Sequence, residues 1–126
     1  MRLLLLATVG GALGSAARYL VISGMNRTYG TNFPWGTLTV NVAGSLCMGF
    51  LADAIVRRFG DSMDLRIFLL TGILGGFTTF SAFSIDIANL IARDQTVSAF
   101  LYILVSVAIS LAALYAGLAL SKALFS

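Results

Sequence analysis

Four long apolar stretches, joined by short connections that hold most of the charged residues, constrain this chain more than any other feature. Only 10% of the residues are charged and 59% are hydrophobic, whereas a soluble domain has about 25% charged residues. So few charges cannot cover a surface that faces water. Because a helix needs about 20 apolar residues to cross a bilayer, the sequence predicts an all-α membrane protein with four spans, surrounded by lipid.

We expect a single transmembrane domain over residues 1–126. The predicted helices cover residues 3–23, 36–54, 65–91 and 97–124, and the third is broken near 75–79. The chain has no histidine and one cysteine, Cys47. This excludes intrachain disulfides, thiolate metal clusters and histidine-based catalysis. With no acid pair in a site and no nucleotide-binding loop, the protein is not expected to be an enzyme.

The net charge of +3 is interpreted as membrane topology rather than as binding to nucleic acid. On the side of both termini we expect five basic residues, namely Arg2, Arg57, Arg58, Arg66 and Lys122. On the opposite side we expect two, Arg27 and Arg93. The count favours termini in the cytoplasm.

The third apolar stretch contains "GGFTTFSAFS" at residues 75–84. Each glycine costs roughly 1 kcal/mol in a helix interior relative to alanine, and threonine adds a smaller penalty. Non-helical backbone at membrane depth is tolerated only where it is buried in protein or lines a cavity. Broken helices often use freed carbonyls to hold a cation. The break therefore predicts an ion or substrate site, and a packing kink is the alternative.

Polar side chains recur at four-residue spacing in two of the spans. The second span has Thr37, Asn41, Ser45 and Gly49, and the fourth has Ser98, Tyr102, Ser106 and Ser110. Each set follows one helix face. Such a stripe indicates either donors that line a water-filled path or hydrogen bonds between helices, which are typically worth under about 1 kcal/mol each.

Three further residues attract attention inside the spans. Phe80 and Phe83 are three apart and share a face after the break. Their ring edges would attract an anion and their faces a cation, whereas two lipid-facing rings would be ordinary. Arg18 lies near the end of the first span, where a guanidinium is either paired or reaches toward the interface.

The segment "PWGTLTVN", which ends in Asn41, and the later "GGFTTFSAFS" resemble the paired signatures of the fluoride channels known as Fluc or CrcB proteins. The similarity covers the whole chain. It implies passive export of fluoride from the cytoplasm across a bacterial inner (plasma) membrane. It also implies an antiparallel, dual-topology homodimer with two pores. A sodium ion would lie at the dimer centre, held by the backbone carbonyls of Gly75 and Thr78 from each subunit.

The resemblance also implies roles for individual side chains. Phe80 and Phe83 would line the pores, and Asn41 would donate its amide to fluoride. The remaining polar residues are a track on the fourth span (Tyr102, Ser106, Ser110), two hydroxyls (Thr39, Ser81) and Arg18 near a pore vestibule. The chain departs from the family motif at Ala82, where a threonine is usual.

Two other classes of protein fit part of the pattern. A small multidrug-type exporter shares the four-span, dual-topology design, but it depends on a membrane-embedded glutamate in the first span. The first span here has no acidic residue, which counts against this class. A structural or assembly subunit would leave the polar stripes to serve only as contacts between helices.

Overall fold

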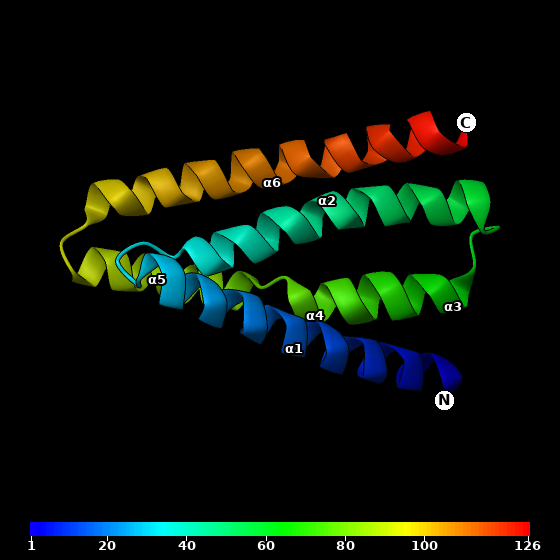
Figure 1. Ribbon diagram of the computed structural model, residues 1–126, viewed down its shortest axis with the longest axis horizontal. Coiled ribbons are helices and arrows are strands. Elements are labelled where there is room, and N and C mark those ends of the chain that lie inside the picture. The colour runs from blue at the N-terminus through cyan, green and yellow to red at the C-terminus, as the bar shows by residue number, and fades with distance from the viewer.

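Four helical rods lie side by side in the computed structural model, which describes residues 1–126 (Figure 1). Three rods are continuous helices: α1 (Arg2–Tyr29), α2 (Trp35–Arg58) and α6 (Thr96–Phe125). The third rod comprises α3 (Met63–Leu65), η1 (Arg66–Leu74), α4 (Gly75–Phe77) and α5 (Phe80–Ala92). All four rods are long and apolar enough to cross a membrane. This confirms the prediction of an all-α fold with four membrane-capable helices, the third of them interrupted.

Both chain termini lie at the same end of the molecule, together with the loop between α2 and α3 (Figure 1). The three ion pairs of the chain also lie there. They join Arg2 to Asp64 at 3.4 Å, Arg57 to Asp53 at 2.7 Å and Arg66 to Asp61 at 3.1 Å. Because charged groups are stable at the water interface and costly within lipid, this clustering marks one boundary of the membrane-embedded region.

Small residues let the rods approach closely, as expected for helices packed in lipid. Gly117 of α6 lies against α2, where an added Cβ would be 2.6 Å from the backbone nitrogen of Phe50. Gly14 of α1 lies against the third rod, and an added Cβ there would meet the carbonyl oxygen of Ile73. These are contacts with backbone atoms, so a larger side chain could not be accommodated by a rotamer change.

The approach to the break has an unusual helical geometry. The nine residues of η1 form a π-helix, in which hydrogen bonds join residues five apart. Such helices are rare, usually span a single turn and often occur at functional sites. The sequence pattern did not indicate this feature, because its apolar residues fit an ordinary α-helix equally well.

The break itself comprises two extended residues. Thr78 has φ −86° and ψ 159°, and Thr79 has φ −154° and ψ 123°. Thr79 also begins the next helix, because its Oγ1 accepts a hydrogen bond of 3.1 Å from the backbone N–H of Ala82. Threonine is well suited to both tasks, since it favours extended backbone and caps helices.

The two glycines before the break remain helical, so the interruption is shorter than the expected range of 75–79. The backbone of Gly76 lies against that of Gly11 in α1, and an added Cβ would be 2.6 Å from the carbonyl oxygen of Gly11. Gly76 therefore serves close packing between helices rather than unwinding of the chain.

Candidate functional site

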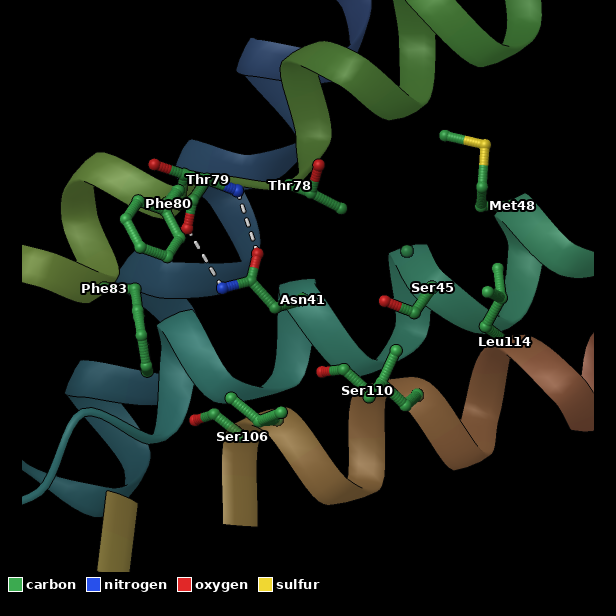
Figure 2. Close-up of a pocket in the computed structure, with 13 residues that line it drawn as sticks. Asn41, Ser45, Met48, Thr78, Thr79, Phe80, Phe83, Ser106, Ser110 and Leu114 are labelled. Carbon is green, nitrogen blue, oxygen red and sulfur yellow. Dashed lines mark hydrogen bonds between the residues drawn. The ribbon is translucent and has the colours of Figure 1, made fainter. Parts of the chain in front are cut away.

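The extended backbone at the break is bonded to a side chain of α2. The Nδ2 of Asn41 donates to the carbonyl of Thr79 at 3.0 Å, and the Oδ1 of Asn41 accepts from the N–H of Thr79 at 2.8 Å. Figure 2 shows this reciprocal pair. A buried backbone N–H and C=O without water must find partners within the protein. Asn41 provides both.

The carbonyls that precede Thr79 at the break have no such partner. No backbone–backbone hydrogen bond crosses from α4 to α5, and no side chain donates to the carbonyls of residues 75–78. These carbonyls therefore keep their oxygens available to another donor or to a cation. No group of three His, Cys, Asp or Glu side chains lies close enough to hold a metal ion, so carbonyl oxygens are the main candidate ligands in this chain.

A groove of about 400 Å³ lies beside the break and between α2 and α6 (Figure 2). Its walls come from three rods. The lining residues are Asn41, Gly44, Ser45 and Met48 of α2, then Thr78, Thr79, Phe80 and Phe83, and finally Ser106, Val107, Ser110, Leu111 and Leu114 of α6. None of them carries a charge. The groove therefore combines an apolar wall with a few neutral hydrogen-bonding groups.

Three serine hydroxyls along the groove lack partners within the chain, whereas the hydroxyls of Thr78 and Thr79 are bonded. Ser106 is only 5% exposed, and its buried Oγ makes no hydrogen bond. Ser45 and Ser110 line the same space and also make none. Elsewhere hydroxyls bond to the carbonyl four residues earlier in their own helix, as Thr8 and Ser84 do. An unsatisfied buried hydroxyl costs about 1–3 kcal/mol, and the hydroxyl of Ser106 is free to donate to an acceptor in this groove.

The two phenylalanines after the break have different environments. Phe80 is 77% exposed, whereas Phe83 is 8% exposed and packs in the core. Their ring centroids are 5.5 Å apart with 51° between the ring planes. Phe83 also lies 5.0 Å from the ring of Tyr102, whose hydroxyl donates to a carboxylate oxygen of Asp86 at 2.9 Å. The aromatic wall thus extends from the open side of the groove into the core.

The structure brings together most, but not all, of the residues predicted for the site. Asn41, Thr78, Phe80, Phe83, Ser106 and Ser110 share the groove. Tyr102 lies behind Phe83, and Ser81 bonds to Thr79 at 3.3 Å without lining the groove. Gly75, Thr39 and Arg18 lie outside it. Arg18 is half-buried and has no ion-pair partner in the chain.

Sequence reasoning missed three members of this region. Thr79 was part of the quoted motif but was given no role, although it binds Asn41 and caps α5. Ser45 belonged to the stripe on the second span but was not chosen as a site residue, although it lines the groove. Asp86, the partner of Tyr102, was not among the residues chosen from the sequence.

Four membrane-capable helices, a broken third helix and an uncharged groove with a few hydrogen-bonding groups beside the break define a channel-like or transporter-like membrane protein. Comparison with known proteins makes this assignment more specific. Residues 5–118 match the family described as "CrcB-like protein, Camphor Resistance (CrcB)". The chain belongs to this family.

Curated relatives align over nearly their entire length. The chain is 52% identical over 124 residues to the fluoride-specific ion channel FluC of Rhizobium meliloti, covering 98% of this chain and 99% of the relative. It is 50% identical over 120 residues to the protein of the same name from Agrobacterium fabrum, covering 95% and 96%. A third, from Mesorhizobium japonicum, is 50% identical over 121 residues, covering 96% and 97%.

Proposed function

We propose that this protein is a passive, fluoride-selective ion channel that exports fluoride from the cytoplasm across a bacterial inner membrane. The observation that carries the proposal is the groove in which the buried, unpaired hydroxyl of Ser106 lies near the rings of Phe80 and Phe83. The similarity to proteins named fluoride-specific ion channels supports the choice of ion. The family is one of channels, so no enzymatic activity is proposed.

The chemistry of the groove suits a small anion in transit. Fluoride is strongly hydrated, so a selective path must replace its water with hydrogen-bond donors. Hydroxyls, an amide N–H and aromatic ring edges can do so. Because no lining residue is charged, the ion would not be trapped by a fixed cation. The groove also has no acidic residue for proton coupling, which argues against a multidrug-type exporter.

The proposed assembly is an antiparallel homodimer with two pores. The exposure of Phe80, at 77%, leaves one side of the groove open in the single chain. A second copy of the chain would cover that side and convert each groove into an enclosed path. In this assembly Arg18 would lie near a pore entrance, and Thr39 and Ser81 would contribute hydroxyls.

The proposed sodium ion would occupy the centre of this dimer. The carbonyls of residues 75–78 accept no hydrogen bond, and carbonyl oxygens are suitable ligands for hard cations. The backbone therefore fits such an ion, with Gly75 and Thr78 as its ligands. Bound there, sodium would neutralise the partial negative charge of the carbonyls and join the two subunits.

The test is passive ion efflux from liposomes that contain the purified protein and sodium, followed first with a fluoride electrode and then with a chloride electrode. We expect rapid loss of fluoride while chloride is retained. Equal loss of both ions would exclude fluoride selectivity. Retention of both ions by a protein shown to be an intact dimer would exclude the channel function.

A further inference from the structure

We propose that Asn41 is a positioning residue that keeps the carbonyl of Gly75 free for the cation, and thereby couples the groove to the cation site. The inference rests on the proposed function, because it concerns the proposed sodium ion. It goes beyond the expected contact between Asn41 and fluoride, since it assigns the side chain a structural task at the helix break.

The argument begins with the hydrogen bonds that an unbroken helix would contain. In an α-helix the N–H of residue i donates to the carbonyl of residue i−4. The N–H of Thr79 would therefore donate to the carbonyl of Gly75. In the structure this N–H donates instead to the Oδ1 of Asn41 at 2.8 Å. Asn41 thus binds the N–H that would otherwise donate to the carbonyl oxygen of Gly75.

The same replacement occurs on the other side of Thr79. Its carbonyl would accept from the N–H of Phe83 in a regular helix, but that bond is absent and the Nδ2 of Asn41 donates to the carbonyl at 3.0 Å. Two bonds from one side chain therefore satisfy the residue at which the helix is interrupted. The partners are 38 residues apart in sequence, so α2 determines the backbone geometry of the third rod.

Loss of the Asn41 amide would leave the N–H of Thr79 without a partner at membrane depth. The nearest remedy is to restore the helical bond to Gly75, because an unpaired backbone group costs several kcal/mol in an apolar medium. That bond would withdraw an oxygen from the cation. Sodium and Asn41 therefore stabilise the same backbone conformation, and their effects must be reciprocal.

The position of Asn41 also links this conformation to the ion path. Asn41 lines the groove, and its amide nitrogen carries two hydrogens, of which one is used in the bond to Thr79. The second can face an anion in the groove. A single side chain would then contact the permeating ion and hold the backbone of the cation site.

The experiment is a sodium titration of the thermal stability of the full-length protein in detergent, with potassium keeping the ionic strength constant. The variant is Asn41→Ala, and the matched control is Ser110→Ala, which alters the same groove without contacting Thr79. We expect the sodium concentration for half-maximal stabilisation to rise about tenfold or more in Asn41→Ala, a loss of about 1.4 kcal/mol in cation binding. It should be unchanged in Ser110→Ala.

An unchanged sodium midpoint in Asn41→Ala, with wild-type fluoride efflux intact, would overturn this inference and leave the channel function standing. A wild-type protein insensitive to sodium would overturn it as well. Absence of fluoride efflux in the wild type would instead count against the proposed function.

A measurement on the wild type keeps the inference testable if Asn41→Ala does not fold. In protein labelled with ¹⁵N-asparagine, replacing potassium with sodium should shift the side-chain amide signal of Asn41. The signals of Asn26, Asn32 and Asn89, which lie in α1, a loop and the C-terminal part of α5, serve as internal controls. Assignment follows by substituting each of these three in turn. An Asn41 signal that is indifferent to sodium would refute the coupling.

Discussion

At the scale of single residues, the exposed ring of Phe80 offers the most direct test of how the groove recognises an anion. Phe80→Ile retains apolar bulk but removes the positive ring edge, so we expect fluoride efflux to fall by about tenfold or more, corresponding to at least 1.4 kcal/mol on the barrier. Phe100→Ile is the matched control, because Phe100 is 64% exposed on α6 and does not line the groove. Undiminished efflux through folded Phe80→Ile protein would exclude a role for the ring edge.

Ser106 allows function to be separated from stability. Its buried hydroxyl has no partner, so Ser106→Ala should leave the unfolding free energy unchanged or raise it by about 1 kcal/mol, while fluoride efflux falls. Ser121→Ala provides the control for efflux, since the hydroxyl of Ser121 is also buried but lies outside the groove, near the carboxylate of Asp53. It should leave efflux unchanged. Thermal unfolding and liposome efflux measure the two effects, and parallel efflux losses in both variants would contradict the assignment.

Side-chain positions could be predicted only in part from the sequence. The four-residue spacing of Ser106 and Ser110 identified a helix face that does line the groove. Spacing could not reveal that Asn41 binds Thr79, because that contact depends on how two separate rods pack. Nor could it show that Phe80 is exposed while Phe83 is buried, since both rings are equally apolar.

At the scale of secondary-structure elements, α1 fixes the position of the third rod through backbone contact. Gly14→Ala adds a Cβ that would lie 2.9 Å from the backbone nitrogen of Phe77 and would also meet the carbonyl of Ile73. We expect a loss of about 1–3 kcal/mol in stability, as for overpacking in a protein core, together with a disturbed break and reduced efflux. Gly24→Ala is the control, because no atom lies within 4 Å of its added Cβ. Equal thermal stabilities of the two variants would disprove the close-packing role of Gly14.

The elements themselves were the most predictable part of the fold, because the length of each apolar stretch is dictated by the bilayer. The internal geometry of these elements was less predictable. The glycines suggested unwinding at 75–76, yet they remain helical and the extended residues are Thr78 and Thr79. Glycine serves both unwinding and close packing, and only the position of α1 distinguishes the two. The π-helix η1 leaves no trace in the hydrophobic pattern.

At the scale of the whole molecule, the open groove and the exposed Phe80 favour completion of the site by a second copy, and its orientation can be measured directly. Both termini lie at one end of the chain (Figure 1), so a single terminal tag reports orientation. The five basic residues at that end against two at the other favour one orientation by the positive-inside rule. An antiparallel dimer requires both.

We therefore expect an impermeant reagent applied to oriented membrane vesicles to label about half of the terminal tags from each side. A tag in the loop between α1 and α2, at the opposite end of the molecule, should give the same proportions and serves as the control. Labelling of the terminal tag from one side only would refute the antiparallel dimer. It would also remove the antiparallel arrangement in which we propose that Gly75 and Thr78 of two subunits share a cation. The open side of the groove in each chain would then have to be covered by lipid or another protein.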